Sequence, residues 1–294
     1  MPSSNPMPTA LLTGAGGFTG RYLDAALSNR GYRVAQMDSS GAQSCDLTDR
    51  KCVEDFVGTE SPDVVVHLAA VSYVAHENAE DFYRVNVIGT LNLLESLAKL
   101  KRAPKRILIA SSGHVYGTPG VEVLDESLCP APISHYACSK LAMEYMVRTW
   151  FDRLPILITR PFNYTGPGQA CHFLVPKIVK HFKERAPFIE LGNLQVSRDY
   201  SDVEDVVAIY MALLESKAKS EVVNICSGRA IALLDIIAMM KEISGHDLEV
   251  RVNPAFERLN EVPRLLGSTA RLQSVTKLPP PRPFHDTLQR MYQQ

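Results

Sequence analysis

Tyr136 and Lys140 are two residues whose types and spacing could carry acid–base chemistry. They stand four positions apart in a segment with helical character, so both side chains project from one face of a helix. A phenol with its ordinary pKa of ~10 is a poor catalyst at neutral pH, and a neighbouring ammonium lowers that pKa by stabilising the phenolate. Ser111 and Ser112 end an apolar strand, at the edge where open α/β sheets bind ligands. These residues predict a site that moves a proton to or from a bound substrate.

A glycine-rich segment near the N-terminus predicts a dinucleotide site. The first apolar strand runs into TGAGGFTG, and an amphipathic helix follows. Glycines at such a turn let the backbone approach a pyrophosphate, whose charge the helix N-terminus stabilises. A glycine-rich turn without a ligand is the alternative, and the strand-to-helix context favours the dinucleotide. The residues expected at the cofactor here are Gly14, Gly17, Phe18, Thr19 and Gly20.

The ends of the next two strands extend this site. Asp38 ends the second strand, where an acid accepts hydrogen bonds from the adenosine ribose and favours NAD(H) over NADP(H), although nearby serines and arginines leave a 2′-phosphate site open. Asp46 and Leu47 flank the adenine in one interpretation; in the other, Asp46 caps a helix from Thr48. Small residues end the third strand, where they either let a flat cofactor approach or simply pack: Leu68, Ala69 and Ala70.

The elements that must position these residues alternate along the chain. Short β-branched runs and longer amphipathic stretches predict an α/β fold with a doubly wound parallel sheet of the Rossmann type. Loop residues multiply beyond residue 160, which indicates a second, smaller lobe. We expect a dinucleotide domain of residues 1–162 and about 203–225, and a substrate lobe of 163–202 and 226–294. The expected strands are Thr9–Thr13, Arg33–Met37, Val64–Leu68, Ile107–Ala110 and Ile156–Thr159; the expected helices are Tyr22–Asn29, Phe82–Leu100, Tyr136–Phe151 and Val203–Leu214.

The composition excludes several classes of protein. A chain of 294 residues, 46% of them hydrophobic, can bury a core. With 31 Lys and Arg against 32 Asp and Glu, no whole-chain field favours nucleic acid or anionic lipid. The longest apolar run, Val206–Leu214, is too short to span a bilayer, and the N-terminus lacks a secretory signal, so we expect a cytoplasmic protein without a membrane partner. The six cysteines form no CxxC pair, so we expect reduced thiols, no disulfide and no metal.

A set of short motifs runs along nearly the whole chain. They are TGAGGFTG, HLAA, the Asn86 of VNVIGT, SSGHVYG, YACSK, RPFNYTGPGQ, VSRDYSDVEDV and VVNICSG. Together they resemble the extended short-chain dehydrogenases/reductases that act on nucleotide sugars. RPFNYTGPGQ and the two motifs after it are similar to the branch of GDP-mannose 4,6-dehydratases and GDP-4-keto-6-deoxy-mannose reductases. SSGHVYG tips the resemblance toward the reductases.

The resemblance implies roles for the candidate catalytic residues. Ser112 would bind the sugar carbonyl oxygen, Tyr136 would donate its proton, and Lys140 would hold the nicotinamide ribose and polarise Tyr136. Ser111 and Phe162 would lie beside the cofactor.

The resemblance also implies a substrate site. Gly113 would leave space beside the sugar, and Asn163 would lie near the sugar diphosphate. Arg198 would grip the diphosphate with its guanidinium; its alternative is a surface ion pair with Asp199 or Asp202. The residues expected around the substrate nucleotide are Val175, Lys177, Arg198, Arg258 and Glu261.

Three functional hypotheses follow. The first is a reductase that uses NAD(H) or NADP(H), with NAD(H) favoured, to convert GDP-4-keto-6-deoxy-D-mannose to GDP-D-rhamnose; hydride addition to the other face would give GDP-6-deoxy-talose. The second is a nucleotide-sugar dehydratase or epimerase, in which the cofactor stays bound and is regenerated every turnover. Dehydration needs proton-transfer groups just after Ser112; these positions hold Gly113 and His114, and alternation along an extended segment would direct His114 away from the Gly113 side. The third is a non-catalytic dinucleotide sensor. The family often forms homodimers through helices that match Phe82–Leu100 and Tyr136–Phe151.

Overall fold

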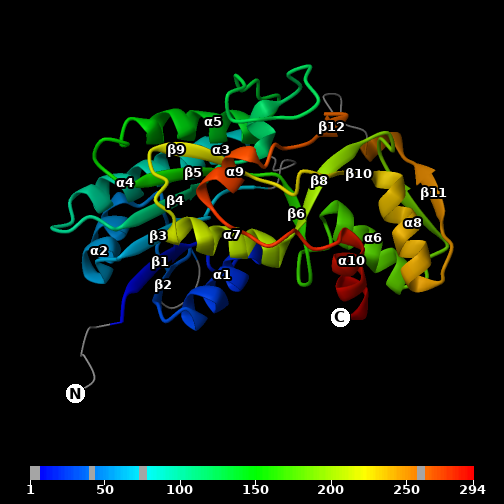
Figure 1. The fold of residues 1–294 in the computed structure, drawn as a ribbon, viewed down its shortest axis with the longest axis horizontal. Coiled ribbons are helices and arrows are strands. Elements are labelled where there is room, and N and C mark those ends of the chain that lie inside the picture. Colours follow the sequence, from blue (N-terminus) through cyan, green and yellow to red (C-terminus); the bar gives the residue numbers. More distant parts are fainter. Residues whose placement is uncertain (1–6, 40–43, 73–77, 257–261) are drawn as a thin grey trace.

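A six-stranded parallel sheet forms the centre of the larger lobe (Figure 1). The computed structural model describes residues 7–39, 44–72, 78–256 and 262–294. The strand order β2-β1-β3-β4-β5-β9 grows outward in both directions from β1 and β3, as in doubly wound sheets. The predicted fold class is therefore confirmed. The strands are β1 (Thr9–Thr13), β2 (Arg33–Met37), β3 (Val64–His67), β4 (Arg106–Ala110), β5 (Ile156–Pro161) and β9 (Glu221–Ile225).

Helices cover both faces of this sheet. Successive side chains of a strand point to opposite faces, so Leu12 of β1 packs in the cluster beneath α1 (Phe18–Asn29) and α7 (Val203–Glu215). Its neighbour Leu11 packs in the other cluster. The helices on that second face are α2 (Arg50–Glu60), α4 (Thr90–Ala98) and α5 (His135–Arg148).

The expected helices Tyr22–Asn29 and Tyr136–Phe151 span Phe18–Asn29 and His135–Arg148, and two other helix predictions differ from the structure in form. The expected helix Phe82–Leu100 is divided into α3 (Ala79–Tyr83), a π-helix (Arg84–Gly89) and α4. The helix expected from Thr48 begins at Arg50, because the side chain of Asp49 accepts hydrogen bonds from the amides of Lys51 and Cys52. The hypothesis that Asp46 caps this helix is therefore wrong.

The smaller lobe contains an apolar cluster of its own, to the right of the sheet in Figure 1. A short antiparallel and parallel sheet, β10-β8-β12 with β6 beside β8, lies between this cluster and the large sheet. The helices of this lobe are α6 (Leu174–Lys183), α8 (Leu233–Ser244) and α10 (Phe284–Gln293), and α9 (Ala270–Val275) lies near β9. Its strands are β6 (Asn163–Thr165), β7 (Phe188–Leu191), β8 (Ser197–Asp202), β10 (Ala230–Ala232), β11 (Glu249–Val252) and β12 (Arg264–Leu265). The chain also forms 3-10 helices at Gly113–Tyr116, after β4, and at Pro254–Phe256, after β11.

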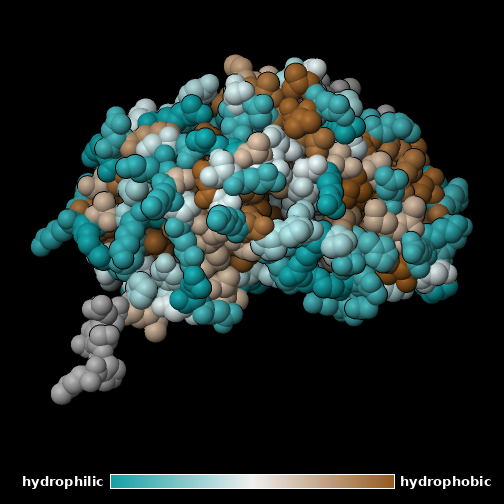
Figure 2. Space-filling view, in the orientation of Figure 1, coloured by the Kyte–Doolittle hydropathy of each residue, from teal (hydrophilic) through white to brown (hydrophobic). Residues whose placement is uncertain are grey.

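The surface in Figure 2 is mostly hydrophilic, with hydrophobic side chains gathered at the top of the view. Exposed apolar residues of the chain between the Gly113–Tyr116 turn and α5 are Val121, Val123 and Ile133. Among the helices of the four described ranges, none combines the length and the apolar character of a membrane span.

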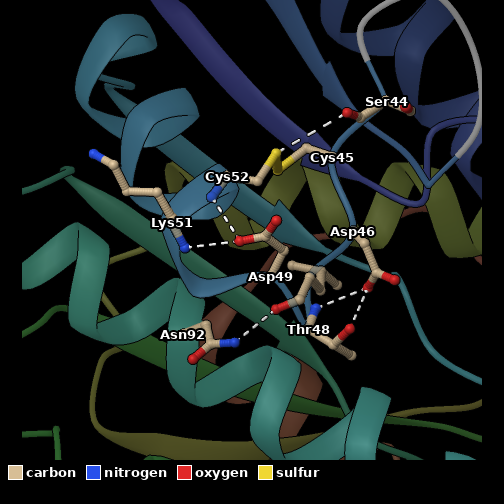
Figure 3. Close-up of a disulfide and its surroundings, with 9 residues drawn as sticks. Ser44, Cys45, Asp46, Thr48, Asp49, Lys51, Cys52 and Asn92 are labelled. Carbon is tan, nitrogen blue, oxygen red and sulfur yellow. Dashed lines mark hydrogen bonds between the residues drawn. A yellow bond between two sulfur atoms is a disulfide. The ribbon is translucent and has the colours of Figure 1, made fainter.

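Cys45 and Cys52 are joined by a disulfide, so the expectation of six reduced thiols is wrong for this pair (Figure 3). The amide of Cys45 donates to the carbonyl of Asp38 at 2.7 Å, and the amide of Cys52 donates to the Asp49 carboxylate in the first turn of α2. The two Cα atoms lie 5.8 Å apart, within the usual range for a disulfide. The two cysteines are seven positions apart, so a search for CxxC spacing does not find the pair.

Candidate active site

The glycine loop after β1 is shaped by close backbone contacts. Gly14 has a φ of +72°, and a Cβ added there would lie 2.9 Å from the amide nitrogen of Ala69. A Cβ added at Gly20 would collide with the carbonyl oxygens of Gly14 and Ala15. Glycine at these two positions therefore lets α1 start directly against the carboxyl end of β1.

This loop fits a dinucleotide. The N-cap of α1 is Gly17, which has no side chain to occupy the first amides of the helix, and the first turn of α1 carries no acidic residue. The amide of Gly16 donates to Asp38 Oδ2 at 3.0 Å, so the acid at the end of β2 lies beside the loop. Helix dipole, free amides and a neighbouring carboxylate match a pyrophosphate followed by a ribose.

Phe18 and Thr19 contact the beginning of the smaller lobe. The Phe18 ring stacks on the ring of Tyr164 with centroids 6.2 Å apart. Thr19 Oγ1 and the Tyr164 hydroxyl are hydrogen bonded at 2.8 Å. Tyr164, which the sequence argument did not single out, thus links the cofactor loop to β6.

A buried histidine fixes the end of β3. Thr90 Oγ1 donates to the carbonyl of Asn86 and therefore accepts from His67 Nε2, while Thr13 Oγ1 donates to His67 Nδ1 at 2.7 Å. Burial lowers the pKa of His67 to about 3, helped by the charge of Lys140, so the ring stays neutral. Thr13 Oγ1 also accepts from the amide of Ala69 at 3.1 Å. The network holds partly exposed Leu68, Ala69 and Ala70 beside the glycine loop.

The two residues proposed for the adenine side differ in exposure. Asp46 is exposed, and its carboxylate accepts from the amide and hydroxyl of Thr48 (Figure 3). Leu47 is buried in the apolar cluster under α2 and α4, and its carbonyl accepts from Asn92 Nδ2 at 2.8 Å. The side chain of Leu47 is therefore already in contact with the apolar cluster in the absence of an adenine.

Ser112, Tyr136 and Lys140 converge at the carboxyl edge of the sheet. Burial raises the pKa of Tyr136 to about 12, and a hydrogen bond with the Ser112 side chain opposes this shift. Lys140 is buried, and its Nζ donates to the carbonyl of Ala110 at 2.7 Å. Burial lowers the pKa of Lys140 to about 8, and the charge of Glu144 opposes that shift. The pKa of Tyr136 is therefore raised, not lowered as its spacing from Lys140 predicts, because burial has the larger effect, and the phenol is protonated at neutral pH.

His114 lies beside this cluster, contrary to the expectation that it points away. The segment Gly113–Tyr116 is a 3-10 helix rather than an extended strand, because the side chain of Ser112 accepts from the amide of His114. The His114 ring meets the Tyr136 ring edge-on, with centroids 6.2 Å apart. A Cβ added at Gly113 would lie 3.0 Å from the Phe162 ring, so buried Phe162 occupies the space that Gly113 was expected to leave beside the sugar, and that expectation is wrong.

The residues proposed for the substrate diphosphate include two buried polar groups. Within the described part of the chain, Asn163 Oδ1 is buried and has no hydrogen-bond partner. Arg198, on β8, is only 8% exposed, and its Nη1 donates to the carbonyls of Ser197 and Pro263. Burial does not suit the alternative of a surface ion pair with Asp199 or Asp202.

Those two carboxylates have other partners. Asp199 accepts from the amides of Ser227, Gly228 and Gly267. Asp202 pairs with Arg290 at 2.5 Å.

The other candidate nucleotide contacts are spread over the smaller lobe. Val175 is buried in its apolar cluster. Lys177 Nζ donates to the carbonyl of Glu190 at 2.7 Å and lies 4.4 Å from the centroid of the Phe256 ring. Arg258 and Glu261 lie outside the described residues.

A buried network that the sequence motifs did not identify lies behind the catalytic cluster. Glu144 pairs with Arg160 at 2.6 Å and accepts a hydrogen bond from Ser111. Its position four residues beyond Lys140 was the available signal, since it places Glu144 on the same helix face.

The described ranges contain no group of three or more His, Cys, Asp or Glu side chains placed to hold a metal ion.

The chain belongs to the NAD dependent epimerase/dehydratase family, whose model matches residues 10–226. The resemblance to extended short-chain dehydrogenases/reductases is thereby confirmed. A GDP-6-deoxy-D-talose 4-dehydrogenase of Aggregatibacter actinomycetemcomitans is 37% identical over 90% of both chains. A GDP-6-deoxy-D-mannose reductase of Pseudomonas aeruginosa is 34% identical, again over 90% of both.

Solved structures agree with these relatives. A Burkholderia cenocepacia protein superposes with a TM-score of 0.92 and 42% identity over 97% of both chains. The Pseudomonas aeruginosa RMD complexed with NADPH superposes with a TM-score of 0.86 and 31% identity, over 97% of this chain and 98% of that one.

Proposed function

We propose that this chain is an NAD(P)-dependent oxidoreductase that reduces the C4 ketone of GDP-4-keto-6-deoxy-D-mannose, with GDP-D-rhamnose as the product. The observation that carries the proposal is the convergence of Ser112, Tyr136 and Lys140 at the sheet edge, beside a glycine loop built for a dinucleotide. The two relatives whose names specify GDP-linked 6-deoxy sugars support the substrate class. Residues 1–162 and about 203–225 would hold the dinucleotide, and residues 163–202 and 226–294 the sugar nucleotide.

The side chains divide the proton chemistry among them. A bound nicotinamide dinucleotide in its reduced form supplies the hydride that C4 receives. The Ser112 hydroxyl donates a hydrogen bond to the ketone oxygen, and the Tyr136 hydroxyl gives that oxygen its proton as negative charge develops there. The raised pKa of Tyr136, which burial causes, keeps the phenol protonated before the reaction. The Lys140 ammonium then stabilises the phenolate that remains.

Buried polar groups support a diphosphate-linked substrate. A buried acceptor without a hydrogen-bond partner destabilises the folded protein. A hydroxyl of a bound sugar would donate a hydrogen bond to Asn163 Oδ1, which is such an acceptor. The Arg198 guanidinium suits bidentate contact with a diphosphate. Lys177, Val175, Arg258 and Glu261 are our remaining candidates for contact with the nucleotide.

Asp38 supports a preference for NAD(H). Its carboxylate lies beside the pyrophosphate loop, where it accepts from ribose hydroxyls and repels a 2′-phosphate. The Pseudomonas aeruginosa RMD structure contains NADPH, so both reduced cofactors belong in the test.

The residues after Ser112 argue against dehydration as the main activity. Removal of the C5 proton and departure of the C6 hydroxyl need a base and an acid, and Gly113 can be neither. His114 approaches Tyr136, so a dehydratase activity would have to use His114 for this proton transfer.

NMR identification of the product from GDP-4-keto-6-deoxy-D-mannose, with NADH and then NADPH, tests this function. GDP-D-rhamnose is the expected product. GDP-6-deoxy-D-talose would place the hydride on the other face, as the 37% identical relative's name implies for that protein. Recovery of unreacted ketone with both cofactors would contradict the proposal.

A cytoplasmic homodimer completes the proposal. Ile88 on the π-helix and Tyr145 on α5 are 47% and 57% exposed, and both lie on the helices that we expect to form the interface. Light scattering of the purified protein should give twice the mass of one chain. Aspartate at both positions should give a single chain; a monomeric wild type would contradict the interface.

A further inference from the structure

Glu144 lies on α5 one helical turn beyond Lys140, so Tyr136, Lys140 and Glu144 share one face of the helix. Its side chain is 1% exposed, and both oxygens have partners. Oε1 accepts from Ser111 Oγ at 2.5 Å and from Arg160 Nε at 2.9 Å, and Oε2 accepts from Arg160 Nη2 at 2.6 Å. One carboxylate therefore joins α5, the end of β4 and β5.

Arg160 extends this connection to the turn that follows Ser112. Its guanidinium carbon lies 4.7 Å from the centroid of the Tyr116 ring. The Tyr116 hydroxyl donates to Asn224 Oδ1 on β9 at 2.8 Å. Glu144 is thus linked to both ends of the 3-10 helix Gly113–Tyr116. Before the helix it accepts a hydrogen bond from Ser111, and at the end of the helix it binds Arg160, which packs on the Tyr116 ring.

A buried ion pair of this kind contributes little net stability compared with apolar side chains of the same volume, because desolvation offsets the attraction. Its charge does act on a neighbouring titratable group. Burial lowers the pKa of Lys140, and Glu144 is the charge that opposes the shift.

The other titratable and charged groups around Lys140 do not replace Glu144. They are His67 on β3, which is neutral, Tyr136 on α5, which is protonated, and Arg160 on β5, whose positive charge Glu144 itself neutralises. The carbonyl of Ala110 on β4 accepts from Lys140 Nζ but carries no net charge.

We propose that Glu144 is a positioning residue for the reduction: it holds Ser111, and with it Ser112, against the helix that carries Tyr136 and Lys140, and its negative charge faces the Lys140 ammonium. The expected effect of Glu144 on kcat rests on the proposed function. The expected effect of Glu144 on the pKa of Lys140 does not, because this pKa is measurable without substrate.

The charge is tested in the substrate-free protein by an NMR titration of lysines labelled with 13C at Cε. Glu144→Gln keeps the shape and an acceptor for Ser111 but removes the charge, so the pKa of Lys140 should fall by about one unit. The Lys140 signal is assigned by its loss in Lys140→Arg. Glu54→Gln is the matched control, since Glu54 pairs with Lys99 on the surface and its loss changes the total charge equally. The same Lys140 titration in Glu144→Gln and wild type would overturn the charge role.

The positioning is tested by kinetics. Glu144→Asp keeps the charge but is one methylene shorter, so it should lower kcat by about tenfold through loss of the Ser111 contact, while the alkaline limb of the kcat profile stays in place. Glu144→Gln should instead move that limb to lower pH, because Lys140 loses its proton sooner. Glu144→Asp leaves no buried charge unpaired, so it serves as the test if Glu144→Gln fails to fold. A wild-type kcat in Glu144→Asp would overturn the proposal. A wild type that reduces no ketone would defeat the proposed function while the NMR result stands.

Discussion

The backbone amide of Gly16 donates a 3.0 Å hydrogen bond to Asp38 Oδ2, which ties the end of β2 to the loop before α1. The same carboxylate is the acceptor that we propose for the adenosine ribose. One side chain therefore bears on both the shape of the pyrophosphate loop and the choice of cofactor.

Asp38→Ala should weaken binding of NADH by about tenfold and of NADPH by less, since the lost acceptor serves a ribose hydroxyl and the lost charge repels a 2′-phosphate. Dissociation constants from cofactor fluorescence measure this. Asp38→Asn is the matched control: it loses the charge as alanine does but keeps an acceptor for Gly16 and the ribose, so it should weaken NADH less than alanine does. A wild type that already prefers NADPH by a wide margin would contradict this role of Asp38.

Tyr136→Phe should lower kcat by at least ~10²-fold, because it removes the proton donor and, apart from the hydrogen bond with Ser112, leaves the surroundings unchanged. The dissociation constant for the reduced cofactor and the melting temperature should stay close to the wild-type values, which separates chemistry from folding. Near-normal turnover in this variant would remove Tyr136 from the mechanism.

Arg198→Ala should raise the KM for the GDP-sugar by about 10- to 100-fold, as expected for loss of a charged hydrogen-bond partner of a diphosphate. Arg198→Lys keeps the charge without the bidentate geometry, so its KM for the GDP-sugar should lie between those of the wild type and Arg198→Ala. Cofactor affinity should barely change. An unchanged KM in a folded alanine variant would leave Arg198 a structural role only, through its bonds to the carbonyls of Ser197 and Pro263.

The Cys45–Cys52 disulfide predicts a thiol count. Protein purified without reductant and then denatured should show four reactive thiols, those of Cys129, Cys138, Cys171 and Cys226, and all six after reduction. Cys45→Ser should destabilise the oxidised protein by about 2 kcal/mol, the value expected for closing so short a loop. Six reactive thiols before reduction would show that the pair is not bonded in solution.

The sequence predicts five of the six strands of the large sheet because each of these carries its own signal, whereas β9 (Glu221–Ile225) is not among the expected strands. Thr9–Thr13 and Arg33–Met37 form strands with the predicted bounds, since β-branched and apolar residues there are bounded by turn residues. The same is true of α7, whose apolar run begins directly after Asp202, the residue that caps it.

The rest of the molecule depends on contacts that local patterns do not encode. Arg198 is placed by β8 pairing with Ile231 on one side and Leu265 on the other. The π-helix interrupts a segment whose periodicity reads as one helix, and the turn at Ser112 rotates His114 toward Tyr136. Pairing between distant segments and the geometry of a single turn decide these features.

The most direct measurement compares two substrates on the purified protein, each with NADH or NADPH, by following nicotinamide absorbance together with NMR of the sugar. We expect GDP-4-keto-6-deoxy-D-mannose to consume one equivalent of reduced cofactor per sugar and GDP-mannose to be left unchanged. Conversion of GDP-mannose to the 4-keto-6-deoxy sugar, with no net change in the nicotinamide, would contradict this expectation and make this chain a dehydratase.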